Sequence, residues 1–400
     1  MKRLLSRLSG FAANAVATGL ATLLSISLII NLHGPADWSV FAVAQSAGLA
    51  GAVLVGFGWA VIGPATVAPL SAAERRREYS IAVRTRTTIF VAVACIATVV
   101  ILSTARGLAI YLPVAIAYAS TGLSSLWYYV GTGQAWPSFF RDALPRAAAS
   151  AVAPLAALMG ATQPILGGVI LTGSFIALVS SWRFVNAEAQ GTILKVDKAA
   201  FFASLSKQWH GLLSGGLSAI YMTLPTVLVG IMAPSAAGVF ALGDKFVRLT
   251  STALLPLTQV LQGWVPRGTA DGRRSRAVRA SRISALTGVC VGAALALAAP
   301  TVAFFFTQGK VPIGFELSVP MGLVLACTLT TQVLGAGCLG AYGDFRAIAI
   351  SAVVGAAVGL PVLFFATAAF AAPGAMSAVV AAEIGVLLTQ SVALIRHLRR

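Results

Sequence analysis

Three charged side chains lie close together in a segment that is otherwise apolar. Asp244, Lys245 and Arg248 fall near the middle of the stretch 236–258. An ionisable group near the centre of a membrane helix costs about 2.5–3.5 kcal/mol on insertion scales, so such groups persist mainly when they are paired, hydrated or functional. The chemistry open to this set is electrostatic, because two cations beside one carboxylate can hold an anion such as a phosphate.

Helical spacing leaves two interpretations of this set. Asp244 and Arg248 are four residues apart and share a face, so they can form an ion pair, whereas Lys245 points in another direction. In the first interpretation the pair is purely structural and Lys245 bonds elsewhere in the bundle. In the second, this face lines a hydrated cavity and binds an anionic substrate. At an effective dielectric of about 20, an ammonium 4 Å from a phosphate charge gains about 4 kcal/mol before desolvation.

Three further polar residues lie in apolar stretches. Glu383 is a candidate acceptor for a coupling proton or sodium ion, and the alternative is that it pairs with a cation from another helix. Asp244 is the second candidate for ion coupling. Gln45 and Asn14 are candidate substrate contacts, with hydrogen bonding between helices as the alternative role.

The sequence contains no pattern typical of an enzyme, a metal site or a bound cofactor. Phosphate-binding loops, HExxH and GxSxG are absent, and the predicted outer loops are too short to carry catalytic carboxylates. The cysteines form no CxxC pair and the histidines have no ligand spacing, so we expect the cysteines to be small buried hydrophobic residues, with no disulfide and no zinc. The cysteines are Cys95, Cys290, Cys327 and Cys338, and the histidines are His33, His210 and His397.

The composition of the chain indicates whether these residues lie in water or in a membrane. Of the 400 residues, 58% are hydrophobic and only 10% are charged, and the mean hydropathy is +0.89. These values indicate an integral membrane protein, and long apolar runs without alternation favour helices over a barrel. The predicted fold is all-α, with twelve spans near 11–32, 38–62, 87–105, 108–130, 144–161, 163–185, 210–232, 236–258, 283–306, 317–341, 347–370 and 375–395.

The basic residues predict the orientation of these spans. The net charge is +17, but the charges are spread over alternate loops, which favours a topology signal over a nucleic-acid partner. With the N-terminus inside, the 28 Lys and Arg residues all fall in cytoplasmic segments except Arg106, Lys310 and the two within 236–258. Arg86 and Arg146 are thereby predicted in cytoplasmic loops. Both termini are predicted to be cytoplasmic, and the tryptophans, near span ends, are predicted interface anchors.

An internal repeat divides the chain. Residues 35–45 align with residues 234–244, every pair being separated by 199 positions, and Pro35 and Val40-Phe41-Ala42 are identical in both copies. Gln45 then occupies the position that matches Asp244. Both copies open the second span of a six-span half, which predicts two parallel lobes around a central cavity. The lobes are 1–186 and 210–400, joined by a cytoplasmic linker, 187–209.

Diffuse motifs carry a family resemblance. They are Gly34-Pro35 with Val40-Phe41-Ala42, then Trp127-Tyr128-Tyr129-Val130-Gly131, and then the run from Gly238 to Arg248. In these the chain resembles the polysaccharide (oligosaccharide-lipid) flippases of the multidrug/oligosaccharidyl-lipid/polysaccharide exporter superfamily. The resemblance implies a MATE-like fold in a bacterial cytoplasmic membrane. It also implies that Lys245 and Arg248 meet a diphosphate or acidic sugar, with Asp244 orienting them.

The function implied by the resemblance is transport of a polyprenyl-diphosphate-linked oligosaccharide from the inner to the outer leaflet by alternating access. The expected partners are this substrate, membrane lipids, and the glycosyltransferases and polymerase of a polysaccharide pathway; nucleic acid is not expected. Two alternatives stay open. One is a multidrug or metabolite antiporter that uses Asp244 and Glu383 for cation exchange, and the other is a non-transporting scaffold of a polysaccharide assembly complex.

Overall fold

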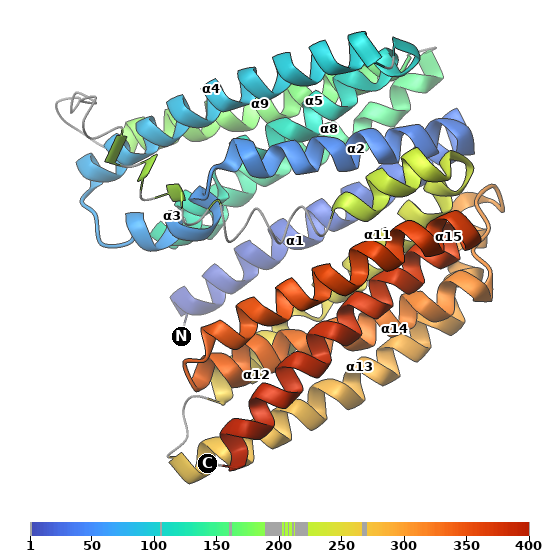
Figure 1. Ribbon diagram of the computed structural model, residues 1–400. Coiled ribbons are helices and arrows are strands. Elements are labelled where there is room, and N and C mark those ends of the chain that lie inside the picture. Colours follow the sequence, from blue (N-terminus) through green and yellow to red (C-terminus); the bar gives the residue numbers. More distant parts are fainter. Residues whose placement is uncertain are drawn as a thin grey trace. The chain divides into compact units, whose positions relative to one another are not determined.

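The computed structural model describes residues 2–104, 106–159, 162–188, 223–265 and 270–399, with isolated residues between 202 and 212. These ranges are helical, with short connections, and contain no strand. The chain forms two compact units, Met1–Val227 and Leu228–Arg400; Figure 1 shows the helices of each. The predicted linker 187–209 and the predicted start of the second lobe at 210 lie largely outside the described residues, so these boundaries stay predictions.

The first unit is built from long helices joined by short 3₁₀ or π-helical segments. The α-helices are α1 Lys2–Leu28, α2 Pro35–Gly56, α3 Trp59–Val67, α4 Ala72–Thr104, α5 Leu112–Ala119, α6 Leu126–Thr132, α7 Ala135–Ser138, α8 Leu144–Val152 and α9 Gln163–Glu188. The short segments are η1 Ile29–His33, η2 Arg106–Tyr111, η3 Ser120–Leu123, η4 Phe139–Ala143 and η5 Ala153–Met159.

The start of α2 follows directly from its sequence. Gly34 has a φ of 94°, which favours glycine, and Pro35 then takes the first helical position, where its fixed φ is already suitable. The helix ends where Phe57 and Gly58 both have positive φ, and α3 begins at Trp59. In the second copy of the repeat, α11 likewise starts with proline, at Pro234.

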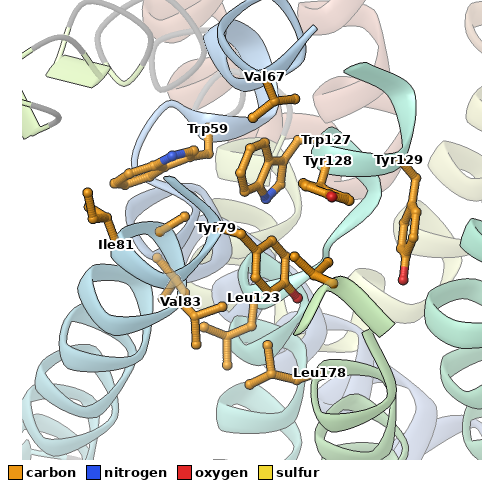
Figure 2. Close-up of a cluster of buried hydrophobic side chains, with 13 residues drawn as sticks. Trp59, Val67, Tyr79, Ile81, Val83, Leu123, Trp127, Tyr128, Tyr129 and Leu178 are labelled. Atoms are coloured by element: carbon orange, nitrogen blue, oxygen red, sulfur yellow. The ribbon is translucent and has the colours of Figure 1, made fainter. Parts of the chain in front are cut away.

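The core of the first unit is rich in aromatic side chains. Figure 2 shows Trp59, Tyr79, Trp127, Tyr128 and Tyr129 gathered with aliphatic residues from α3, α4, η3 and α9. The rings of Tyr79 and Trp127 stack with 6.1 Å between centroids. The prediction of interface anchors is wrong for Trp38, Trp59 and Trp127, which are buried. It fails because apolar composition cannot distinguish a ring at the membrane surface from a ring between helices.

The second unit consists of α11 Pro234–Ala253, α12 Leu255–Trp264, α13 Ala270–Thr307, α14 Phe315–Gln332, η6 Val333–Leu339 and α15 Phe345–Arg399. Small residues let α13 and α14 approach closely. A methyl group at Gly292 would lie 2.4 Å from the carbonyl oxygen of Gly322. Such contacts are the usual basis of helix packing in lipid, where water does not drive association.

Two antiparallel arms, 345–370 and 372–399, make up α15. They meet at Ala371, whose φ of 50° and ψ of −126° are not helical. Gln390 Nε2 donates to Ser351 Oγ at 3.1 Å across the arms. At their far end, His397 Nε2 and Asp344 Oδ2 lie 2.8 Å apart. The arms therefore run side by side, as Figure 1 shows.

The helices agree with the predicted spans in position. Within the described ranges, eight helices are long and apolar enough to cross a membrane. They contain the predicted spans 11–32, 38–62, 87–105, 108–130, 163–185, 283–306 and 317–341 to within several residues, and α15 contains 347–370 and 375–395. The span 144–161 falls on α8 and η5, and 236–258 on α11 and α12. Of 210–232, the structure describes the short apolar helix Thr223–Met232.

The largest differences concern helix starts. The predicted start at 87 corresponds to a helix that begins at Ala72, and the predicted start at 283 to one that begins at Ala270. Hydropathy marks only the apolar part of a helix, whereas Arg, Ala and Glu propagate the helix beyond it. The predicted cytoplasmic loop 267–282 is therefore largely the beginning of α13.

Candidate functional site

The charged residues of α11 form one group in the second unit. Arg248 Nε donates to Asp244 Oδ2 at 2.6 Å, and the two side chains are 32% and 21% exposed. The predicted ion pair is thus confirmed. Lys245 is half-buried beside it. The pair is short and charge-assisted, so it fixes the guanidinium while leaving part of it accessible.

The sequence of α11 explains why these side chains have fixed positions. Residues before them, including Phe240, Leu242 and Gly243, are buried. A methyl group at Gly243 would lie 3.0 Å from Met321 Sδ of α14, and Phe246 packs against Phe306 of α13 with ring centroids 5.9 Å apart. The apolar side of α11 is therefore anchored next to the charged residues, as a binding site requires.

A polar connection links α11 to α14. Gln332 Nε2 donates to Ser251 Oγ at 3.5 Å, one turn after Arg248. Gln262 of α12 donates in turn to the Gln332 carbonyl oxygen at 3.3 Å. Gln332 and Ser251 could not be predicted from sequence, because neutral polar residues are common in membrane helices and only their spatial proximity sets these two apart.

Glu383 lies on the second arm of α15, facing α14. Thr331 Oγ1 donates to Glu383 Oε2 at 3.4 Å, and Thr331 directly precedes Gln332. Among the described residues, Glu383 has no ion pair with a basic side chain. The predicted alternative of a cationic partner therefore has no support within those residues, and the carboxyl group is held by a hydroxyl group.

The two other candidates lie in the first unit. Asn14 Nδ2 of α1 donates to Ser138 Oγ of α7 at 2.9 Å, while Asn14 Oδ1 is buried without a partner among the described residues. Gln45 is buried in α2, and its Oε1 also lacks a partner within that part of the chain. Asn14 thus makes the predicted hydrogen bond between helices, and both amides retain an acceptor that can bind a further donor.

A buried ionic cluster in the first unit was not predicted. Arg146 Nε lies 3.3 Å from Asp142 Oδ1, and Arg86 is 1% exposed. The placement of Arg86 and Arg146 in solvated loops is therefore wrong, since α4 and α8 carry them into the unit. Counting charges by loop could not find this cluster, although the spacing of Asp142 and Arg146 by four residues was a signal for a pair.

The side chains of this cluster form hydrogen bonds with backbone groups at a break in a helix. The helical path through α5 and η3 ends at Leu123, and α6 starts at Leu126. Arg86 Nη1 donates to the carbonyl oxygens of Gly122 and Ser124 at 3.2 and 2.8 Å. Asp142 Oδ1 accepts from the Ser125 amide at 3.1 Å. Free backbone groups in a membrane must be satisfied by protein, and here two charged side chains do so.

The described residues contain no group of three or more His, Cys, Asp or Glu side chains that could hold a metal ion. The cysteines were expected to be buried; this is wrong for Cys95 and Cys290, which are exposed. Both lie on apolar helices, α4 and α13, where an exposed small apolar side chain is compatible with lipid.

The helical architecture of the chain is similar to that of solved membrane transporters, among them a lipid II flippase and a MATE transporter. These similar structures are of transporters rather than enzymes. The prediction of an all-α, MATE-like fold with two lobes is confirmed. No protein-family model matches the chain, and no curated protein matches it.

Three solved structures illustrate the likeness. The lipid II flippase MurJ, in an inward closed conformation, matches 97% of this chain and 89% of its own, with a TM-score of 0.77 and 11% identity. The eukaryotic MATE transporter AtDTX14 matches 99% and 97%, with a TM-score of 0.59 and 12% identity. A MOP superfamily transporter from Pyrococcus furiosus matches 99% and 96%, with a TM-score of 0.56 and 14% identity. Identities this low establish the fold alone.

Proposed function

We propose that this protein is a flippase that moves a polyprenyl-diphosphate-linked oligosaccharide from the inner to the outer leaflet by alternating access. The observation that carries the proposal is the charged group on α11. Lys245 and the partly exposed Arg248 supply cations for a diphosphate, and Asp244 holds Arg248 in place. The similarity of the fold to that of the lipid II flippase MurJ supports a lipid-linked substrate.

The roles of the other candidate residues follow from their contacts. Gln45 and Asn14 each have a buried acceptor that has no partner in the described part of the chain, which suits hydroxyl groups of a sugar. Glu383 is the candidate for a coupling proton or cation, with Asp244 as the second. The protein is proposed to act in a bacterial cytoplasmic membrane with both termini inside. Glycosyltransferases and a polysaccharide polymerase are its proposed neighbours in the pathway.

The test is a flipping assay in proteoliposomes with a fluorescent polyprenyl-diphosphate oligosaccharide. We expect Lys245→Met and Arg248→Met each to lower the initial rate at least about tenfold, because a charge-assisted hydrogen bond contributes about 1.5–3 kcal/mol. Arg282→Gln, which removes an exposed cation from α13, is the matched control and should keep the normal rate. A normal rate in both α11 variants contradicts the proposed binding role.

A second candidate function rests on Glu383. Since its described contact is a hydroxyl group, the carboxyl group is free to exchange a proton or a cation, as an antiporter of the multidrug branch requires. Efflux of a cationic dye that is lost in Glu383→Gln and Asp244→Asn would favour this function over the flippase. If neither substrate moves, while the protein still copurifies with the polymerase, the scaffold function is favoured.

A further inference from the structure

A groove opens between the two arms of α15, near the end where the chain terminates. It has a volume of about 390 Å³, and its walls include Ile350 on the first arm and Leu388 and Val392 on the second. These three side chains are all at least partly exposed. Arg396, one turn beyond Val392, is the single charged residue of the lining.

The pairing of the arms places a second cation at the same level. Ser351 bonds to Gln390, and a methyl group at Gly355 or Gly359 would touch Val386 or Ala382 respectively. The arms therefore run antiparallel in one register, in which Asp344 meets His397. By this register, Arg346 lies at the level of Ile395 and Arg396.

Both arginines are available to a ligand. Each is exposed, and neither forms an ion pair in the part of the chain that the structure describes. The nearby carboxylate, Asp344, is bonded instead to His397 and to the Ala347 amide. The groove thus has mostly apolar walls over the terminal turns of the two arms and two arginines at one end.

We propose that this groove binds an anionic glycerophospholipid. One acyl chain lies along Ile350, Leu388 and Val392, and the headgroup phosphate contacts Arg396 and Arg346. Charge complementarity selects this occupant. A zwitterionic lipid has no net charge to offer the arginines. Basic pockets between membrane helices commonly hold anionic headgroups in this way.

The site is separate from the charged group of α11, and it makes the lipid a bound partner of the second unit. A lipid between the arms contacts both of them, so it stabilises their pairing by binding the folded unit alone. This inference goes beyond the proposed transport function and does not depend on it.

Native mass spectrometry of the full-length protein in detergent tests the proposal. Phosphatidylglycerol should form a one-to-one adduct at concentrations at which phosphatidylcholine does not. Arg396→Gln and Arg346→Gln should each weaken this adduct about fivefold, the effect of one basic residue near an anionic headgroup. Arg279→Gln, which removes an exposed cation from α13, should leave it unchanged.

A second pair of variants tests the contribution of the apolar wall independently of the charges. Leu388→Trp fills the groove and should also weaken the adduct, whereas Leu323→Trp, at an exposed apolar position of α14, should not. Equal binding of the two lipids, or equal loss in Arg279→Gln, would overturn the proposal. Preferential binding of undecaprenyl phosphate over phosphatidylglycerol would overturn it as well.

The outcome can be distinguished from that of the flipping assay. Lys245→Met should retain the phosphatidylglycerol adduct at full strength, because Lys245 does not line the groove. Loss of the adduct in Lys245→Met would place the lipid at α11 and contradict the proposed site, whatever substrate the protein transports.

Discussion

At the scale of single residues, Asp142 joins a buried ion pair to the backbone of a broken helix. It pairs with Arg146 and accepts the Ser125 amide. Removing one partner of a buried pair costs about 3–5 kcal/mol, because the remaining charge is left unpaired. We expect Asp142→Ala to lower the free energy of unfolding in detergent by about 3 kcal/mol. Glu316→Ala, at an exposed helix start, should cost less than about 1 kcal/mol; equal losses would refute this role.

A second prediction concerns pH. The hydrogen bond with His397 and the Ala347 amide lower the pKa of Asp344 below its ordinary value of 3.8. A lowered pKa in the folded state means that the stabilisation is complete above pH 3.8 and is lost as the pH falls through the folded value. The difference in melting temperature between the natural protein and Asp344→Asn should therefore shrink below pH 3.8. A difference that stays constant between pH 6 and pH 3 contradicts this linkage.

Residue roles were only partly predictable from sequence. The pair of Asp244 and Arg248 follows from helical spacing alone and is confirmed. Arg86 could not be placed, because its partners come from residues 122–124, which are distant in sequence. The burial of Trp127 was missed for the same reason. Long-range contacts of this kind leave no local pattern.

At the scale of elements, the turn at Ala371 is a point of strain. A positive φ disfavours residues with a Cβ atom, and glycine avoids this cost of about 1 kcal/mol or more. We expect Ala371→Gly to raise the thermal stability of the protein or leave it unchanged, and Ala371→Val to lower it, as measured by tryptophan fluorescence during heating. A large loss in Ala371→Gly would show that the methyl group is needed for packing.

Element positions were predictable because each membrane helix must supply a long apolar run. The ends of the helices were not predictable from the sequence. The starts of α4 and α13 depend on charged helical turns outside the apolar part, and the break before α6 depends on side chains that satisfy its backbone groups. In that case the decisive residues, Arg86 and Asp142, lie on other helices.

At the scale of the whole molecule, the repeat was the most informative sequence signal. Both copies begin a helix with proline at its first position, at Pro35 and Pro234, and each helix is followed by a short one, α3 or α12. The offset of 199 residues thus describes a duplicated structural unit. The two copies differ in their polar side chains, since Gln45 of the first copy occupies the position of Asp244 in the second.

The interruption between η3 and α6 also limits which substitutions this protein can accept during evolution. Its backbone oxygens and amide are satisfied by side chains from two other helices, so shifting the interruption by even one residue would misalign all of these bonds. Arg86 and Asp142 are consequently each expected to be retained among descendants of this chain for as long as the interruption remains.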